Sequence, residues 1–214
     1  MTRRLHTVRR HRDPCAHVLV LHGGQQRSTE PTSWRQLSVL RSRLFASAVA
    51  RAGAPHRIDV SFLRYARRGW NDGAPVRDAR WALETVRAEH PGLPVGLLGY
   101  SMGGRVALHL ADGVETVVTA AAWVDEADLS VLRPPASGRV LLLHGSEDQM
   151  TAAEGSRLAA ERLRGLGADA RARTDLADTH GMMRHRAAWH RLASAHLVEV
   201  LTGSTCAAEG RGAD

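Results

Sequence analysis

Short apolar runs alternate with helix-like segments along most of this chain, and this alternation limits its possible folds more than any other feature. It begins near residue 16 and continues almost to the end. The runs expected as strands are residues 16–21, 57–65, 93–99, 114–123, 139–143 and 168–174. The segments expected as helices are 34–52, the stretch from Pro75 to Pro91, 102–111, 152–166 and 184–201. The alternation predicts α/β architecture with a mainly parallel sheet flanked by helices.

The length and composition indicate one folded domain. The chain has 214 residues, of which 43% are hydrophobic and 24% charged, so it can bury a sizeable core and is not disordered throughout. The sequence contains no internal repeat that would indicate a second unit. We therefore expect a basic N-terminal segment at 1–15, a folded domain at 16–202, and a disordered tail of small and polar residues at 203–214.

The positive charge of the chain is a weak indication of a nucleic-acid partner. The formal net charge is +7, and all 29 basic residues are arginine. Nucleic-acid-binding proteins gather basic side chains on one face and often add aromatic side chains that stack on bases. Here only the first dozen residues form a basic cluster, and aromatic residues make up 4% of the chain. We expect no nucleic-acid partner; steeply salt-dependent retention on DNA would show otherwise.

Cysteine usage and apolar runs suggest a cytoplasmic protein. Cys15 and Cys206 stand near opposite ends of the chain and form neither a disulfide framework nor a metal-binding pair. The longest apolar run near the N-terminus, around 16–21, is far shorter than a membrane span, which needs about 20 residues. It is also too short for a secretory signal. We expect a soluble, cytoplasmic protein without a membrane partner.

A G-x-S-x-G motif lies where an expected strand passes into an expected helix. Residues 99–103 read GYSMG, with Ser101 at the centre. Such a turn displays a serine nucleophile, and the flanking glycines let the strand and the helix pass close to it. The helix N-terminus also directs the Met102 N–H and a partial positive charge toward an oxyanion. The motif predicts Ser101 as a nucleophile and Met102 as part of an oxyanion hole.

An aspartate and a histidine follow this serine at positions suited to acyl-transfer chemistry. Asp148 comes just after the strand expected at 139–143, where a carboxylate can orient a histidine and stabilise its imidazolium form. His180 lies in a loop before the last helix, from which it can take the serine proton. The chain order serine, aspartate, histidine is that of one class of serine hydrolases.

The identity of the acid has alternatives. Asp125 and Asp128 follow the strand expected at 114–123, and some hydrolases take their acid from that strand. Glu147 is also adjacent to Asp148. We expect Asp148 to be the acid, and loss of turnover on replacing Asp125 or Asp128 alone would contradict this assignment.

These motifs resemble the α/β-hydrolase superfamily, and the chain is most similar to its small, lidless esterase members. The resemblance extends from His22 to about Leu201. It implies that Ser101 is the nucleophile, Asp148 the acid and His180 the base. It also implies that the HGGQ turn at 22–25 supplies the second oxyanion N–H, with Gly24 as the expected donor and Gln25 as the alternative.

Two departures narrow this resemblance. Many relatives insert a lid where this chain has only residues 124–138, so the cleft is expected to be open and long-chain lipids are disfavoured substrates. Serine at position 101 argues against the cysteine-dependent dienelactone branch and against aspartate-dependent dehalogenases. The loop at 67–73 resembles the family's glycine-containing loop, although Trp70 and Asn71 are uncommon there.

The remaining site expectations concern aromatic, basic and histidine side chains. Trp34, Trp70 and Trp123 lie in or near loops after strands, on the sheet edge where α/β proteins bind ligands, so they are candidate substrate-binding residues. Arg105 is interpreted as a surface arginine. The histidines at 180, 185 and 190 lack the spacing of helical metal ligands, and we expect neither a metal nor a cofactor. His22 and His144 are expected to be structural.

The sequence thus predicts a serine hydrolase. Its substrate would be a small-molecule carboxylic ester or thioester, cleaved through a covalent acyl-enzyme. An acyltransferase using the same residues, or a non-catalytic ligand-binding protein with this fold, are the alternatives. The acyl chain length, the leaving group and the oligomeric state stay open.

Overall fold

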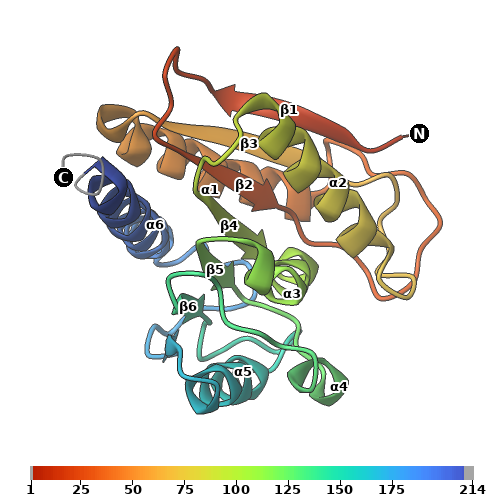
Figure 1. Ribbon diagram of the computed structural model, residues 1–214. Coiled ribbons are helices and arrows are strands. Elements are labelled where there is room, and N and C mark those ends of the chain that lie inside the picture. The colour runs from red at the N-terminus through yellow and green to blue at the C-terminus, as the bar shows by residue number, and fades with distance from the viewer. Residues whose placement is uncertain (1, 210–214) are drawn as a thin grey trace.

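A computed structural model describes residues 2–209 (Figure 1). Its strands are β1 (Arg4–Arg9), β2 (Ala16–Leu21), β3 (Ile58–Arg64), β4 (Val95–Tyr100), β5 (Thr116–Ala120), β6 (Arg139–Leu143) and β7 (Asp169–Arg173). Its α-helices are α1 (Leu37–Gly53), α2 (Ala74–Glu89), α3 (Met102–His109), α4 (Glu126–Leu129), α5 (Ala153–Gly165) and α6 (Arg186–Glu209). Short 3-10 helices are η1 (Ala54–His56) and η2 (Ala111–Gly113).

The strands form one sheet in the order β1-β3-β2-β4-β5-β6-β7. Every neighbouring pair is parallel except β1 with β3, which is antiparallel. Helices α1 and α6 cover one face of the sheet, and α2, α3 and α5 cover the other (Figure 1). The predicted α/β-hydrolase fold is therefore confirmed, including the absence of a large lid.

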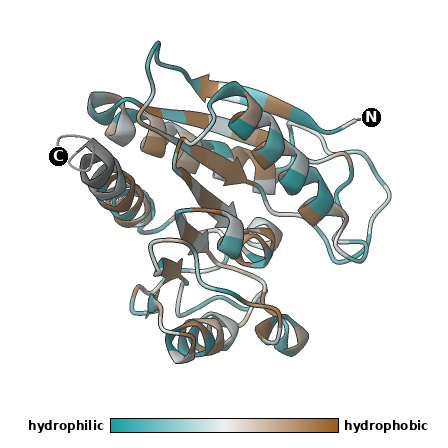
Figure 2. Cartoon of the chain, in the orientation of Figure 1, coloured by the Kyte–Doolittle hydropathy of each residue, from teal (hydrophilic) through white to brown (hydrophobic). Residues whose placement is uncertain are grey.

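The central strands carry apolar side chains on both faces because helices cover both sides. In β2, Val18 and Val20 pack toward α1 and α6, while Leu19 and Leu21 pack toward the opposite helices. All of these side chains are fully buried. Figure 2 shows the apolar colour concentrated in the central strands and on the inner sides of the helices.

The two ends of the chain differ from a simple basic segment and tail. Residues 4–9 of the basic segment form the edge strand β1, with a register shift between Thr7 and Arg9. Its sequence, RLHTVR, has no apolar run because an edge strand with one open side needs none. At the other end, α6 continues past Leu201 to Glu209. Residues 210–214 of the predicted tail lie outside the described residues.

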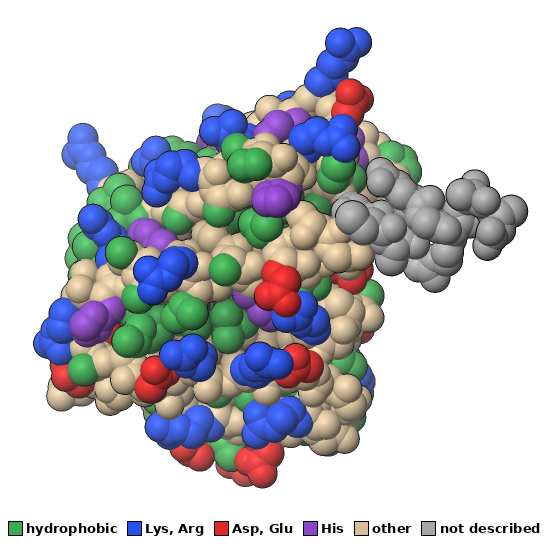
Figure 3. Space-filling model, turned by 90° about the vertical axis from the view of Figure 1, so that its left-hand side faces the viewer, with side chains coloured by type: hydrophobic (Ala, Val, Ile, Leu, Met, Phe, Trp, Pro, Cys, Tyr) green, Lys and Arg blue, Asp and Glu red, His purple; other side chains and the backbone are tan. Residues whose placement is uncertain are grey.

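The segment between β5 and β6 holds only the short helix α4, within a stretch that the sequence predicts as a polar linker. Asp125 and Asp128 form a capping box that begins this helix, which explains why so short a helix is stable. Within residues 2–209, no helix has the length and hydropathy required to span a bilayer. On the face drawn in Figure 3, arginine side chains are scattered and acidic side chains lie between several of them.

Candidate active site

Ser101 occupies a strained turn between β4 and α3. Its φ is 55° and its ψ −120°, a backbone conformation that is costly for a residue with a side chain. The turn is tight because a Cβ at Gly99 would collide with the Gly103 carbonyl, and one at Gly103 would collide with the Leu21 carbonyl. The Ser101 N–H donates to the Ala120 carbonyl at 2.9 Å, which fixes the turn to β5.

Ser101, His180 and Asp148 form one hydrogen-bonded chain. The Ser101 Oγ lies 3.1 Å from His180 Nε2, and His180 Nδ1 lies 2.8 Å from Asp148 Oδ2. Ser101 comes from the β4–α3 turn, Asp148 from the loop after β6, and His180 from the loop between β7 and α6. The turn and the two loops each follow the carboxyl end of a strand, and because these strands are parallel, all three lie at the same end of the sheet. The Asp148 side chain is fully buried.

Asp148 accepts more hydrogen bonds than the one from His180. His144 Nε2 lies 3.1 Å from Asp148 Oδ2, and the Thr151 hydroxyl donates to the same oxygen at 2.9 Å. The main-chain N–H groups of Met150 and Thr151 donate to Oδ1 at 2.8 and 3.1 Å. Burial alone would raise the pKa of Asp148, but the hydrogen bonds from His144, His180 and the Thr151 main chain hold it well below its usual range. The carboxylate is therefore ionised.

The alternative acids lie elsewhere. Asp128 Oδ1 contacts His109 Nε2 at 2.7 Å, and Asp128 Oδ2 pairs with Arg105 Nε at 2.9 Å. Asp125 Oδ2 pairs with the Arg105 guanidinium at 2.9 Å. Burial would raise the pKa of Asp128, but the bonds from His109, the Asp125 main chain and Arg105 keep it below its usual value. Of the three candidate aspartates, only Asp148 contacts His180.

The loop that carries His180 is held by a second buried carboxylate. Asp178 accepts hydrogen bonds from the main-chain N–H of Thr179 and His185 and from Trp189 Nε1, each at 2.9 Å. The Tyr100 hydroxyl donates to the His180 carbonyl at 2.9 Å. Neither anchor was predicted from the sequence, although Asp178 lies close to His180 along the chain. The only available signal was an aspartate two positions before a loop histidine.

The main-chain groups expected to form an oxyanion hole differ in availability. The Gln25 N–H already donates to the Arg68 carbonyl at 2.9 Å, so Gln25 is unsuited to the role. By contrast, the Gly24 and Met102 N–H groups make no hydrogen bond to any acceptor within residues 2–209. A Cβ at Gly24 would meet the Met102 side chain, so the two residues lie against each other. Of the three expected donors, Gly24 and Met102 thus keep main-chain N–H groups without an acceptor in the described residues.

His22 fixes the turn that contains Gly24. Its Nδ1 lies 2.6 Å from the Gly23 carbonyl, and its Nε2 accepts from the Tyr65 N–H at 3.3 Å. These partners require the proton on Nδ1. Burial lowers the pKa of His22 to about 4, so the ring is neutral near pH 7. The structure thus gives His22 the supporting position that the sequence predicts.

A cavity of about 410 Å³ opens over Ser101 and His180. The remaining lining residues are Gly24, Gln25, Gln26, Trp123, Asp125, Met150 and Thr151. A neighbouring cavity of about 870 Å³ shares Gln26, Trp123 and Asp125 with it and is also lined by Trp70. Trp70 and Trp123 therefore lie in the cleft where the sequence expects them.

Trp34 does not reach this cleft, and its expected substrate-binding role is not supported. Its ring packs edge-on against His6 with centroids 4.6 Å apart, and it lies 5.9 Å from the Phe62 ring. It lines a different cavity, beneath β1. The error arises because Trp34 follows a strand by many residues, and the intervening loop carries it away from the strand ends.

Arg105 is buried and is not the surface arginine that the sequence suggests. Its guanidinium carbon lies 4.1 Å from the centroid of the Trp70 ring and 4.3 Å from that of Trp123. Asp125 and Asp128 neutralise it. The group therefore joins α3, α4 and the cleft tryptophans, and its charge is already matched.

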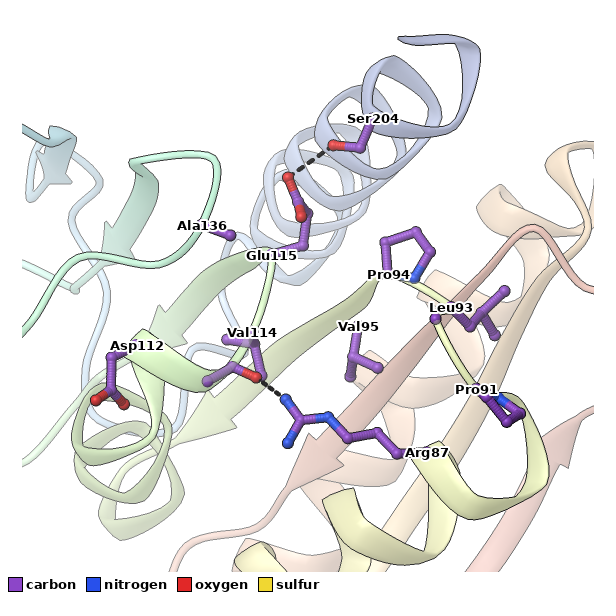
Figure 4. Close-up of a pocket in the computed structure, with 12 residues that line it drawn as sticks. Arg87, Pro91, Leu93, Pro94, Val95, Asp112, Val114, Glu115, Ala136 and Ser204 are labelled. Carbon is purple, nitrogen blue, oxygen red and sulfur yellow. Dashed lines mark hydrogen bonds between the residues drawn. The ribbon is translucent and has the colours of Figure 1, made fainter. Parts of the chain in front are cut away.

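Another cavity, of about 710 Å³, lies at the other end of the parallel strands, where β4 and β5 begin (Figure 4). It is lined by residues at the start of β4 and β5, among them Pro94, Val95 and Glu115. Arg87 donates to the Gly113 carbonyl and Ser204 donates to Glu115 across its wall. None of the Ser101 cleft residues lines it. Within residues 2–209, no cluster of three or more His, Cys, Asp or Glu side chains is arranged to hold a metal ion.

Comparisons with known proteins agree with this architecture. A lidless α/β serine hydrolase from Xanthomonas campestris has 18% identity and a TM-score of 0.65, over 91% of this chain and 87% of that one. Est1E from Butyrivibrio proteoclasticus has 12% identity and a TM-score of 0.66, over 93% of each chain. An esterase from Pyrococcus furiosus has 12% identity and a TM-score of 0.67, over 88% of this chain and 84% of that one. The search of curated proteins gave no significant match.

The model of the dienelactone hydrolase family matches residues 48–196. This region includes Ser101, Asp148 and His180 and covers most of the folded domain. The expectation that a serine at position 101 separates the chain from the dienelactone branch is therefore wrong at the level of the family, since the family model matches across that serine. The chain belongs to the dienelactone hydrolase family and is a hydrolase.

Proposed function

We propose that the protein hydrolyses a carboxylic ester, or a thioester, through a covalent acyl-enzyme on Ser101. The Ser101 Oγ attacks the carbonyl carbon while His180 Nε2 takes its proton. Asp148 holds His180 and stabilises its imidazolium form. The N–H groups of Gly24 and Met102 bind the oxyanion of the tetrahedral intermediate. His180 then protonates the leaving oxygen or sulfur, and water activated by the same ring releases the acid.

The observation that carries this proposal is the continuous chain from Ser101 through His180 to Asp148. Both ring nitrogens of His180 are engaged, at 3.1 Å by the serine and at 2.8 Å by the carboxylate. A strained serine backbone at φ 55° adds support, since such strain persists mainly at functional sites. The match to the dienelactone hydrolase family adds further support, because the lactone in that family's name is a cyclic ester.

The shape and charge of the cleft favour a neutral ester with a short acyl group. The cavity over Ser101 has a volume of only about 410 Å³, whereas the adjoining one has about 870 Å³. We assign the acyl group to the small cavity and the leaving group to the larger one. Arg105 is paired with Asp125 and Asp128, so it offers no free positive charge to an anionic substrate.

Hydrolysis of p-nitrophenyl esters tests the proposal. Purified wild-type protein should hydrolyse acetate and butyrate esters faster than long-chain esters, and Ser101→Ala should reduce turnover to the uncatalysed background. A fluorophosphonate probe should label the wild type and leave Ser101→Ala unlabelled. Equal rates in the two proteins, with folded wild type that the probe does not label, would instead indicate a ligand-binding protein.

A further inference from the structure

A separate cavity of about 550 Å³ lies between the edge strand β1 and helix α1. In the antiparallel pairing of β1 with β3, His6 lies opposite Phe62 and Arg4 lies opposite Arg64. Directly opposed residues share a face of the sheet, so these four side chains are on the α1 side with Phe62. Trp34 forms one wall and Arg43 of α1 stands at the rim.

This cavity has cationic groups around one aromatic ring. The guanidinium carbons of Arg43 and Arg64 lie 5.4 and 5.6 Å from the centroid of the Trp34 ring, within cation–π range. The His6 ring contacts the same tryptophan at 4.6 Å. Arg4 is near enough, with Arg64 and Arg43, to help burial lower the pKa of His6.

Within residues 2–209, these cations lack anionic partners. Neither the exposed Arg43 nor the buried Arg64 forms an ion pair with a carboxylate of the described residues, whereas the buried Arg105 and Asp148 side chains are paired. Arg64 is only 8% exposed, and its Nε is buried without a hydrogen-bond acceptor. His6 Nε2 is also buried and unpartnered. Arg64 does not line the cavity but lies on its Trp34 wall, and because burying an unpaired charge is costly, an anion close to it would offset that cost.

We propose that this cavity, lined by His6, Trp34, Arg43 and Phe62, binds a small organic anion whose carboxylate or phosphate carries a flat apolar group. The cations supply the attraction for the oxyanion, and the Trp34 and Phe62 rings supply walls for the apolar part. No residue lines both this cavity and the one over Ser101. The site is therefore independent of the proposed ester hydrolysis.

Isothermal titration of the full chain with defined probes tests the site. Benzoate and phenyl phosphate should bind, with affinity that falls as salt rises, and benzyl alcohol of similar shape should not. Inorganic phosphate should bind more weakly than phenyl phosphate. Tighter binding of benzoate would identify the ligand class as carboxylates, and tighter binding of phenyl phosphate would identify it as phosphate esters. Equal binding of inorganic and phenyl phosphate would overturn the role of the aromatic walls.

Matched variants on one helix locate the binding. Arg43→Gln should weaken the tighter anion by about tenfold, as expected for loss of one charge-assisted contact. Arg51→Gln is the control, because Arg51 is exposed on the same helix and does not line this cavity. Unchanged affinity in Arg43→Gln, or no difference between benzoate and benzyl alcohol in the wild type, would overturn the proposal.

A spectroscopic measurement reports on the site directly. The ring resonances of His6 should shift on addition of the anion, while those of the exposed His56 should not. His6→Gln identifies the His6 signals. Ester hydrolysis by Arg43→Gln serves as the check that the variant folds, since Arg43 lies outside the Ser101 cleft. Binding without any change at His6 would place the anion elsewhere and contradict the assignment.

Discussion

At the scale of single residues, the most informative contact is the one between Asp148 and His144. The His144 Nε2 faces Asp148 Oδ2 at 3.1 Å and the Thr151 carbonyl at 3.0 Å, so this nitrogen must carry the proton. Its Nδ1 lies 2.8 Å from the Ser156 hydroxyl and accepts from it. A fully buried histidine thus holds the carboxylate that we propose as the acid, through the same Oδ2 that contacts His180.

Replacing His144 by Phe should lower kcat about tenfold and leave KM nearly unchanged. The phenyl ring keeps the volume but removes the hydrogen bond to Asp148, so the carboxylate holds His180 less firmly in the transition state. KM should hold because His144 does not line the cavity over Ser101. Steady-state kinetics on a short-chain p-nitrophenyl ester measures both constants.

Ser156→Ala is the matched control for His144→Phe. It removes only the partner of His144 Nδ1 and leaves the Asp148 contact in place, so kcat should change far less. A rise in KM with unchanged kcat in His144→Phe would mean that His144 shapes the cleft instead of positioning Asp148.

At the scale of elements, the β7–α6 loop depends on one carboxylate. Asp178 is 2% exposed and satisfies three main-chain N–H groups, those of Thr179, Arg184 and His185, and the indole N–H of Trp189. Trp189 is itself fully buried in the core at the start of α6. The Asp178 side chain therefore ties the loop that carries His180 to the first turns of the last helix.

Asp178→Ala should destabilise the protein by about 3 kcal/mol and reduce ester hydrolysis. The loss follows because several buried N–H groups lose their acceptor at once. Asp178→Asn keeps one acceptor oxygen and should fall between Ala and the wild type. Urea unfolding gives the free energies.

Asp175→Ala is the control in the same loop. Asp175 is exposed and pairs only with Arg173, so its loss should cost less than about 1 kcal/mol. Comparable losses for Asp175→Ala and Asp178→Ala would contradict the anchoring role of Asp178.

The same scale shows why some elements follow from the sequence and others do not. The buried strands were predictable because helices on both faces require continuous apolar runs such as Ala16–Leu21. Strand β1 has no such run, because it is held mainly by main-chain bonds to β3. Ser101, Asp148 and His180 were predictable because each follows a recognisable strand. Arg105 was not, because its partners Trp70 and Trp123 come from other elements.

At the scale of the whole molecule, several buried and half-buried histidines link stability to pH. Burial lowers the pKa of His17, His22, His190 and His196 to about 4 in each case. In the unfolded chain these rings regain a pKa of about 6.5. Between these values the unfolded state binds more protons than the folded state. Stability is therefore complete above about pH 6.5 and declines as the pH falls toward 4.

The dependence should be steep, and His17 offers the clearest test of it. Each fully buried neutral histidine contributes a slope of up to about 1.4 kcal/mol per pH unit within this window. His17 is 6% exposed, and neither of its ring nitrogens has a partner within residues 2–209. His17→Leu should therefore reduce the slope of unfolding free energy against pH between 4 and 6.5 without lowering stability at pH 7.

His56→Leu provides the comparison, because His56 is exposed and water surrounds its ring in both the folded and the unfolded chain. Urea unfolding at several pH values should give it the wild-type slope. A slope in His17→Leu equal to that of His56→Leu would show that His17 is already protonated, or already neutral, in both states. The acid sensitivity would then have to come from the remaining buried histidines or from carboxylates such as Asp148, which titrate at lower pH.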